Sequence, residues 1–484
     1  MIDAPKLEIA VVALGLIILL VEAFAKTLDK RALAIAGLVG LGAVLVATFF
    51  VAPAPPTAGV AGFWSFYTAD PMAIFFKRFA LVTTMLVLIL MIEYAPVVRQ
   101  SIHGATHQSG LGEFFALPLF TCAGLMWMAS ATDFIMIFVS LELVTMSFYG
   151  LVAFTRRNPL TLEAGVKYLI LSALSTGFLV YGITWIFGAT GETNLARIAP
   201  VLANPDVQRV PALFGMALVL VALGFKIAAV PFQIWVPDVY EGAPTPVTAY
   251  LSVGSKAAGF VVLLRVLQPF LMLPQIERLL VGLAALTLIY GNLAAIPQTN
   301  LKRLLAYSSI AHAGYLLVGV VSLAGPAVGF YLVSYLLMTM LSFAVLIVVS
   351  KQTGDRIEDF NGLARRSPFL SFAMLIAMAS LAGIPLTAGF LGKFFVFDAA
   401  VRQHQTMLIV VGVITVACGF YYYFKVIRAM YWEAPLSTAA IPLSGLSRVT
   451  MITLMAAIVF LGVYPEPILK SLRAQTTAVA ASVP

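Results

Sequence analysis

The 484-residue sequence is poor in charged side chains. Only 10% of its residues are charged and 61% are hydrophobic, whereas a soluble domain carries about 25% charged residues. This composition excludes an ordinary soluble protein and predicts an all-α, polytopic membrane protein. The net charge of +8 fits basic loops on one face of a membrane, and no basic soluble face for nucleic acid is present.

Cysteines and nucleotide-binding motifs are also scarce. The two cysteines, Cys122 and Cys418, lie far apart in apolar runs. We therefore expect no iron–sulfur or zinc site and small buried thiols instead. Thr387 stands where a phosphate-binding loop ending at Gly392-Lys393 would need its first glycine, and no dinucleotide fingerprint exists. The chain must therefore use an ion gradient or be driven by a partner.

Apolar runs long enough to cross a bilayer, about 20 residues each, recur about fourteen times. The first is interpreted as a transmembrane helix and not a signal peptide, because Asp3 and Glu8 outnumber Lys6 before it. The turn near Asp133 separates the fourth and fifth runs. The predicted spans are 8–25, 32–52, 71–92, 112–130, 132–154, 162–188, 211–237, 246–270, 277–297, 302–323, 327–350, 367–399, 405–431 and 448–470.

The distribution of basic residues predicts the orientation of these spans. The loops after spans 1, 5 and 11 are the richest in them, which places these loops in the cytoplasm and both termini outside. Lys77, near the start of the third span, is interpreted as an interface anchor, and His103 and His107 as solvated loop residues. The basic loop residues are Lys26, Lys30, Arg31, Arg156, Arg157, Lys351, Arg356, Arg365 and Arg366.

Two of the predicted helices carry a proline close to a lysine. Span 7 contains Lys226 and then Pro231, and span 12 contains Pro385 and then Lys393. A proline inside a helix removes a backbone donor, so both prolines are expected to break their helices, and alanine at either site to straighten them. In lipid, the freed carbonyls are tolerated only beside protein or a wet cavity. An ordinary proline kink is the alternative interpretation.

The two interrupted helices lie five spans apart. A repeat with an odd number of helices enters the membrane from the opposite face in its second copy, so this spacing predicts two inverted five-helix repeats, spans 4–8 and 9–13. The single transmembrane domain 1–484 then divides at the loops between these units. Its parts are 1–110, 111–271, 272–432 and 433–484.

Five charged side chains are predicted to lie within spans. A charge at the bilayer centre costs about 2.5–3.5 kcal/mol on insertion scales and marks ion or proton pathways. Lysine suits a proton relay because, unlike arginine, it can lose its proton when buried. The candidates are Glu142, Lys167, Lys226, Lys256 and Lys393.

Each candidate also has a structural explanation. Glu142 can be a static ion-pair partner, Lys226 can simply satisfy the carbonyls of the broken helix, and Lys256 can be a packing lysine that extends to an interface. Lys167 lies only about a turn into its span and can extend to the interface. His312 can be a hydrogen-bonded core residue, although its near-neutral pKa keeps it a relay candidate.

Two stretches of the sequence are similar to a known family. The segments 224–246, from Gly-Phe-Lys-Ile-Ala-Ala-Val-Pro-Phe to Tyr-Glu-Gly-Ala-Pro-Thr-Pro, and 389–394, Gly-Phe-Leu-Gly-Lys-Phe, resemble the antiporter-like subunits of respiratory complex I, the proton-pumping NADH:quinone oxidoreductase. The form of the first segment resembles the subunit N family in particular. The resemblance covers essentially the whole chain.

The resemblance implies roles for the buried charges. Glu142 would pair with Lys226, Lys256 would be the central relay lysine, Lys393 would pass the proton outward, and Lys167 would modulate the Glu142–Lys226 pair. A lysine at position 393 argues against the sibling subunit M, in which a glutamate is usual. The end of the chain soon after span 14 argues against the lateral helix of subunit L.

The resemblance further implies a multi-pass subunit of a translocase in a bacterial inner membrane. NADH, FMN, iron–sulfur clusters and quinone would be bound by other subunits and not by this chain. The expected partners are subunit M, the small subunit K, the lateral helix of subunit L and the lipid bilayer. Two alternatives remain, a subunit of a multisubunit cation/proton antiporter and a purely structural membrane scaffold.

Overall fold

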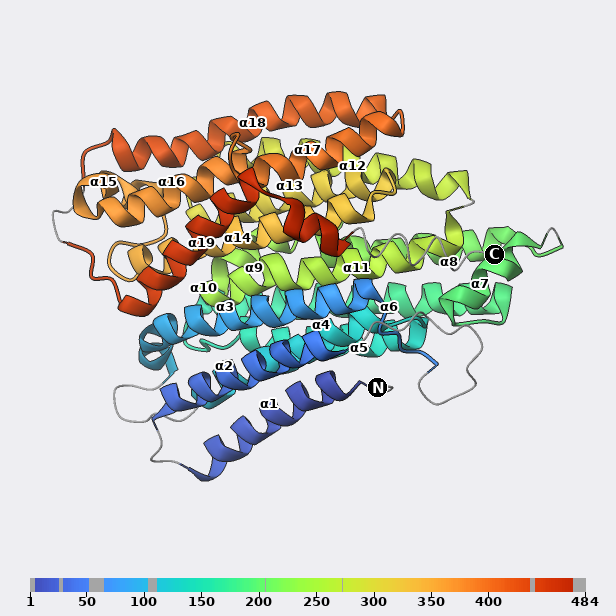
Figure 1. Ribbon diagram of the computed structural model, residues 1–484, viewed down its shortest axis with the longest axis horizontal. Helices are drawn as coiled ribbons and strands as arrows, with labels where there is room; N and C mark the ends of the chain where they lie inside the picture. Colours follow the sequence, from blue (N-terminus) through green and yellow to red (C-terminus); the bar gives the residue numbers. More distant parts are fainter. Residues whose placement is uncertain are drawn as a thin grey trace.

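The computed structural model describes residues 5–25, 29–51, 65–102, 111–204, 206–271, 273–435 and 440–472. These residues form helices that run roughly side by side (Figure 1). Isolated bridges such as Asp133 with Asn194 are the only extended pairing among the described residues. His103 and His107 lie outside the described residues. The all-α prediction is confirmed.

The helices of span length follow the predicted apolar runs. Thirteen segments of the described chain are long and apolar enough to cross a membrane. One of them, 245–270, is built from α10, a π-helical turn (Leu251–Ser255) and α11. The others are α1 Lys6–Phe24, α2 Lys30–Ala47 with the turn after it, α3 Pro71–Ile102, α4 Leu111–Ser130, α5 Phe134–Val152, α6 Pro159–Thr190, α8 Arg209–Ile227, α12 Pro274–Ala295, α13 Leu301–Val321, α14 Gly325–Ser350, α18 Thr406–Tyr431 and α19 Gly445–Val463.

The remaining helices are shorter. Two of them, α16 and α17, follow each other where span 12 was predicted, and neither is long enough to be counted among the thirteen. The described chain therefore has thirteen helices of span length, against about fourteen predicted spans. The short helices are α7 Leu195–Ala203, α9 Val236–Gly242, α10 Thr245–Tyr250, α11 Lys256–Leu267, α15 Leu363–Arg366, α16 Pro368–Ala382 and α17 Ala388–Arg402.

Polar caps set the helix starts in this apolar sequence. Asp133 accepts a hydrogen bond from the Ile135 amide at the start of α5, which confirms the predicted boundary between spans 4 and 5. Asn158 and Asn300 cap α6 and α13 in the same way. Such caps satisfy amide groups that have no partner inside the helix. These three helices therefore begin within three residues of the predicted runs, whereas α3 ends ten residues later and α8 ten residues earlier than predicted.

The two predicted helix breaks have the same backbone geometry. Helix α8 ends at Ala228, whose φ is 65°, and the Ala229 amide donates to the Gly224 carbonyl at 2.8 Å. Helix α16 ends at Gly383, whose φ is 91°, and the Ile384 amide donates to the Ala379 carbonyl at 3.0 Å. A left-handed residue with this back-bonding is a Schellman termination.

The prolines do not act as the sequence suggested. Pro231 lies three residues after Ala228, and Pro385 lies two residues after Gly383, so both are outside the helices that they were expected to interrupt. The expectation that alanine at these positions would straighten the helices stays a prediction, but the terminations at Ala228 and Gly383 argue against it. The chain has already left the helical path, and one restored amide would not undo the termination.

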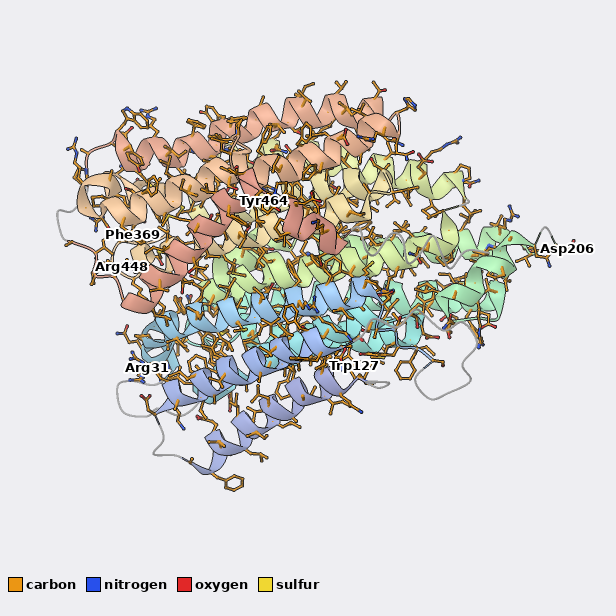
Figure 2. All side chains as sticks on the ribbon, viewed as in Figure 1. Arg31, Trp127, Asp206, Phe369, Arg448 and Tyr464 are labelled. Atoms are coloured by element: carbon orange, nitrogen blue, oxygen red, sulfur yellow. The ribbon has the colours of Figure 1, made fainter. Side chains whose placement is uncertain are left out.

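The two broken helices run in opposite directions. Figure 2 places Asp206, just before α8, at one edge of the molecule and Phe369, at the start of α16, at the opposite edge. Arg31 and Arg448 lie at the same edge as Phe369 (Figure 2). Equivalent terminations in antiparallel helices agree with the inverted repeat of spans 4–8 and 9–13.

Prediction for the helix ends. A left-handed conformation costs a non-glycine residue roughly 1–2 kcal/mol. Ala228→Gly should therefore raise the thermal denaturation midpoint of the protein. Gly383→Ala should lower it, because the added Cβ would also lie 3.2 Å from Lys393 Cδ. A thermal melt of the purified protein checks both, and a lower midpoint for Ala228→Gly would contradict the cap assignment.

Candidate functional site

Four titratable side chains lie buried in the centre of the bundle. Lys226 is 3% exposed, Lys256 1%, Lys393 6% and His312 0%. They come from α8, α11, α17 and α13, and the α10–α11 span and α13 are almost entirely buried in the described protein. The structure therefore brings together the mid-span residues that the sequence singled out.

The Lys226 side chain contacts the face of α5 that carries Glu142. The Thr176 hydroxyl donates to Glu142 Oε1 at 2.7 Å, and Lys226 Nζ donates to the Thr145 hydroxyl at 2.8 Å. Thr145 lies one helical turn beyond Glu142, on the same face of the helix. The lysine is thus held by a neutral hydroxyl beside the glutamate. Among the described residues, no ion pair within 4.0 Å joins Glu142 to Lys226.

A glycine allows α11 to lie against the Lys226 side chain. A Cβ on Gly259 would come within 2.7 Å of Ile227 Cγ2 and 3.6 Å of Lys226 Cβ. Gly259 is three residues after Lys256 and therefore on the same side of α11. This close approach places the stem of Lys226 beside the helix that carries Lys256.

Lys256 follows the π-helical turn directly. Its ammonium donates to both the carbonyl and the hydroxyl of Ser309 on α13, and it lies 5.7 Å from the ring centre of Tyr335. The Tyr335 hydroxyl in turn shares a hydrogen bond of 2.7 Å with Ser252. Single π turns in α-helices frequently mark functional sites.

His312 lies between two tyrosine hydroxyls. Its Nδ1 is 2.8 Å from the Tyr331 hydroxyl and its Nε2 is 3.1 Å from the Tyr423 hydroxyl. Neutral imidazole has one donor and one acceptor nitrogen, so it can bond to both hydroxyls and exchange a proton with either. The Tyr423 hydroxyl also shares a hydrogen bond of 2.5 Å with Ser308.

Two further tyrosines connect His312 to the lysines on either side. The His312 ring is 5.1 Å from the Tyr335 ring, which lies beside Lys256, and 6.1 Å from the Tyr315 ring. The Tyr315 ring lies 5.1 Å from Lys393 Nζ. His312 therefore stands between Lys256 and Lys393, with one aromatic ring on each side.

Lys393 supports the broken end of α16. Its ammonium donates to the Leu381 and Ala382 carbonyls at 2.9 and 2.8 Å. These carbonyls have no partner inside the helix, and the partial negative charge of a helix C-terminus favours a cation. The same geometry fits a structural cap and a proton-binding amine.

Lys167 lies apart from the buried group. Its side chain is 39% exposed and forms ion pairs of 2.6 Å with Glu163 and with Asp238. Asp238, outside the candidate spans, also accepts from Arg303 at 2.9 Å. Burial raises the pKa of Asp238, but the hydrogen bonds from Lys167 and Arg303 outweigh burial and hold this pKa below its usual range. Lys167 reaches the surface, as its position near a helix start suggested.

Sequence reasoning misjudged one lysine in the N-terminal helices. Lys77, which we interpreted as an interface anchor, is 2% exposed and forms an ion pair of 2.8 Å with Glu8. It also donates to the Tyr67 hydroxyl at 2.6 Å. Its position inside an apolar run was the available signal, but the partner on α1 could not be read from the sequence.

Other polar residues were missed altogether. The tyrosines around His312 read as ordinary aromatic core residues, because a hydroxyl leaves no signature in an apolar pattern. Arg265 forms a bidentate ion pair with Asp70 at 2.9 Å, near the end of its span. In the described residues, no three His, Cys, Asp or Glu side chains gather as metal ligands would.

Relatives of this chain carry one consistent name. Residues 131–419 match the family described as NADH:quinone oxidoreductase/Mrp antiporter, transmembrane. A protein of Desulforamulus reducens named NADH-quinone oxidoreductase subunit N is 44% identical over 409 residues, which are 83% of each chain. A protein of Trichlorobacter lovleyi with the same name is 42% identical over 436 residues, 88% of this chain and 86% of its own.

Solved structures share the fold over almost the whole chain. A chain in respiratory complex I from Thermus thermophilus with bound Aureothin superposes with a TM-score of 0.80 at 32% identity, covering 97% of this chain and 99% of its own. A chain of the Mrp complex from a Dietzia species superposes with a TM-score of 0.83 at 20% identity, covering 100% and 98%. At that identity the second match shows the fold alone.

Prediction for lysine accessibility. A membrane-impermeant acylating reagent should modify Lys167 and the exposed Lys470 in the purified protein. Lys226, Lys256 and Lys393 should remain unmodified, because each is 6% exposed or less. Mass spectrometry of the labelled peptides checks this. Modification of Lys256 as fast as Lys470 would contradict the buried site.

Proposed function

The chain belongs to the family of antiporter-like membrane subunits to which subunit N of NADH-quinone oxidoreductase belongs, and from this premise we propose that it translocates protons through its buried glutamate and lysines. Redox chemistry in other subunits drives the transfer. NADH, FMN, iron–sulfur clusters and quinone belong to those subunits, and this chain contributes the membrane path.

One observation supports this function above the others. Lys226, Lys256 and Lys393 each donate to neutral hydroxyls or carbonyls, and none of the three is in a carboxylate ion pair within the described residues. A structural lysine in a membrane usually pairs with a carboxylate, because an unpaired buried charge is costly. Amines held by neutral groups can instead gain and lose protons.

The proposed path follows the geometry of the site. Glu142 modulates the charge of Lys226, and a proton passes from Lys226 to Lys256 across the contact at Gly259. From Lys256 it passes by Tyr335 and His312 to Lys393, with the tyrosine hydroxyls and bound water as intermediates. Lys167, in its surface ion pairs, acts at most on the approach to this path.

The proposed function also implies an orientation in the membrane and a set of neighbouring subunits. The edge with Arg31 and Phe369 faces the cytoplasm of a bacterial inner membrane, and both termini face the periplasm, because basic loops favour the inside. Subunit M, subunit K and the lateral helix of subunit L are the proposed neighbours. Co-purification with flavoprotein and iron–sulfur subunits would distinguish this assignment from a multisubunit cation/proton antiporter, and the variants below distinguish both from a scaffold.

Prediction for the first pair. Glu142→Ala and Lys226→Ala should each strongly reduce proton pumping by the assembled complex, because each removes a titratable group from the path. Glu142→Asp should be milder, since it keeps the carboxylate. Proton uptake and NADH-to-quinone turnover in vesicles check this. Near-normal pumping by both alanine variants at normal assembly would reject the pair as functional.

Prediction for the relay. Lys256→Ala and Lys393→Ala should each impair pumping, whereas Lys167→Ala should have the weakest effect, because Lys167 is half-exposed and outside the buried group. The same vesicle assay ranks the three variants. If Lys167→Ala were the most damaging, the path would have to run through the surface cluster.

A further inference from the structure

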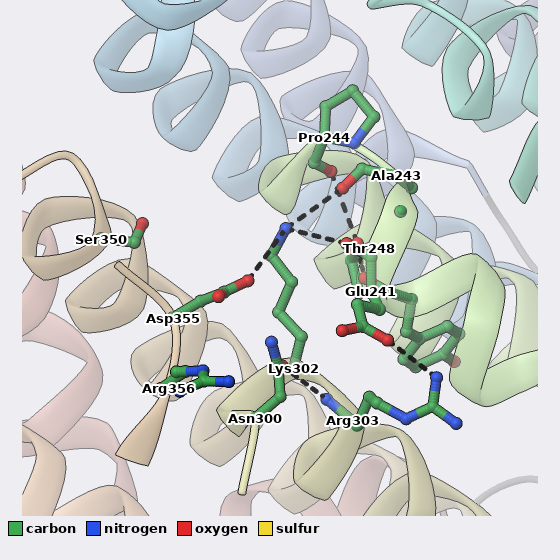
Figure 3. A network of polar contacts seen from close by, with 12 residues as sticks. Glu241, Ala243, Pro244, Thr248, Asn300, Lys302, Arg303, Ser350, Asp355 and Arg356 are labelled. Atoms are coloured by element: carbon green, nitrogen blue, oxygen red, sulfur yellow. Dashed lines mark hydrogen bonds and ion pairs between the residues drawn. The ribbon is translucent and has the colours of Figure 1, made fainter. Parts of the chain in front are cut away.

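A second buried lysine region lies at the edge that the proposed function assigns to the cytoplasm. Lys302, the second residue of α13, is 8% exposed, although the neighbouring Arg303 is much more open to solvent. Its ammonium donates to the Glu241 carbonyl at 3.2 Å and to the Ala243 carbonyl at 3.4 Å (Figure 3). The Lys302 ammonium thus binds the carbonyls at the C-terminal end of α9.

Lys302 has one distant carboxylate partner among the described residues. Asp355 Oδ2 lies 3.9 Å from its Nζ, and the Asp355 side chain is 33% exposed. The Glu241 carboxylate is bound instead by Arg303, at 2.7 Å. Figure 3 shows the Lys302 ammonium between Asp355 on one side and Glu241 on the other. Asp355 is therefore a carboxylate that meets both solvent and a buried amine.

The position of Asp355 is set by the backbone. The Leu301 amide donates to the Asp355 carbonyl at 2.7 Å, and the Ile357 amide donates to the Thr299 carbonyl at 2.8 Å. These bonds join the segment after α14 to the start of α13. Asp355 and Lys302 are held together by the fold and do not depend on a chance surface contact.

Buried polar side chains continue from Lys302 toward Lys256. Ser309 lies two helical turns beyond Lys302 on the same face of α13, about 10 Å along the axis, and it binds Lys256. The Tyr240 hydroxyl shares a hydrogen bond of 3.3 Å with Ser309, and the Thr248 hydroxyl donates to the Tyr240 carbonyl at 3.0 Å. All of these side chains are at most 1% exposed, apart from Lys302.

We propose that Asp355 and Lys302 form the uptake site through which protons reach Lys256 from the cytoplasmic side. The inference rests on the proposed function. A proton from bulk water binds the Asp355 carboxylate and passes to the neutral Lys302 amine. It then moves by water and the Tyr240 and Ser309 hydroxyls to the Lys256 amine. One proton leaves the bulk phase, one arrives at Lys256, and Asp355 and Lys302 return to their starting states.

A purely structural role for Lys302 is the competing explanation, because lysines commonly cap the carbonyls at helix ends. Lys302→Arg separates the two roles. Arginine keeps the positive charge and the donors for the Glu241 and Ala243 carbonyls, but it does not release its proton. Asp355→Asn keeps the shape of Asp355 but cannot bind a proton, and Asp355→Glu keeps the carboxylate.

The experiment measures proton pumping by the whole complex in proteoliposomes, from mildly acidic to mildly alkaline pH. Asp355→Asn should pump near-normally at acidic pH and severalfold more slowly at alkaline pH, where proton capture limits the rate. Lys302→Arg should pump severalfold more slowly at every pH, because its guanidinium cannot pass a proton on. Asp355→Glu should keep the normal profile. The other titratable and charged groups around this pair are Glu241, Tyr94, Arg356, Glu358 and Asp359.

Glu358→Gln is the matched control. Glu358 is a carboxylate three residues from Asp355, but it is 57% exposed and pairs only with the exposed Arg356 among the described ion pairs. It should leave the pH profile unchanged. A normal profile for both Asp355→Asn and Lys302→Arg would overturn the uptake site, as would a profile altered equally by Glu358→Gln.

Parallel measurement of Lys256→Ala distinguishes failure of this inference from failure of the proposed function. If Lys256→Ala stops pumping while Asp355→Asn and Lys302→Arg pump normally at every pH, the relay stands and protons enter elsewhere. If Lys256→Ala also pumps normally, the relay itself is wrong. If Lys302→Arg does not assemble, the alkaline profile of Asp355→Asn alone decides the inference.

Discussion

A lysine amine in an apolar bundle must find polar partners, and this constraint organises the centre of the molecule. The hydrocarbon of the bilayer offers no hydrogen-bond partner, so the interior of the bundle has to supply the oxygens. Thr145 supplies one to Lys226, Ser309 supplies two to Lys256, and the end of α16 supplies two to Lys393. The central helices therefore converge on the lysines, and α11 and α13 are almost wholly buried.

The backbone carbonyls and amides freed at the helix breaks must also find polar partners. At the end of α8 the indole nitrogen of Trp235 donates to the Phe225 carbonyl at 3.1 Å, and the Val230 amide donates to the Thr287 hydroxyl of α12 at 2.9 Å. At the end of α16 it is the Lys393 ammonium that binds the free carbonyls. The first break thus ties one repeat to the other, and the second break binds a titratable group directly.

The lysines fall into two classes by the charge of their partners. Lys77, Lys167 and Lys351 lie within 2.8 Å of carboxylates and join helices that are distant in sequence. The lysines of the relay are held by neutral oxygens. Lys302 stands between the classes, with two carbonyls and one carboxylate at 3.9 Å. Lys425 is also held by carbonyls, those of Ile296 and Gln298, but it is only half-buried. Deep burial together with neutral partners is therefore what distinguishes the lysines of the proposed relay.

The sequence by itself determined the membrane bundle and the approximate positions of its spans, the places of the two breaks and the identity of the mid-span charges. Apolar run length reflects bilayer thickness, and a charge inside such a run stands out whatever it contacts. The sequence did not determine partners. Lys77 was assigned to the interface although it pairs with Glu8, and Pro231 and Pro385 were taken as the breakers although Ala228 and Gly383 end the helices.

Only the tertiary structure decided which polar groups meet. It brought the Lys226 ammonium to the Thr145 hydroxyl beside Glu142 and placed His312 among tyrosines. It also brought Asp355 to Lys302 through the segment after α14. Hydrophobic periodicity reports whether a residue faces the bundle or the lipid, but it contains no information on which helix lies opposite. That choice depends on close helix packing. At Gly259, for example, an added Cβ would lie 2.7 Å from Ile227 Cγ2, so even one extra methyl group would prevent this contact.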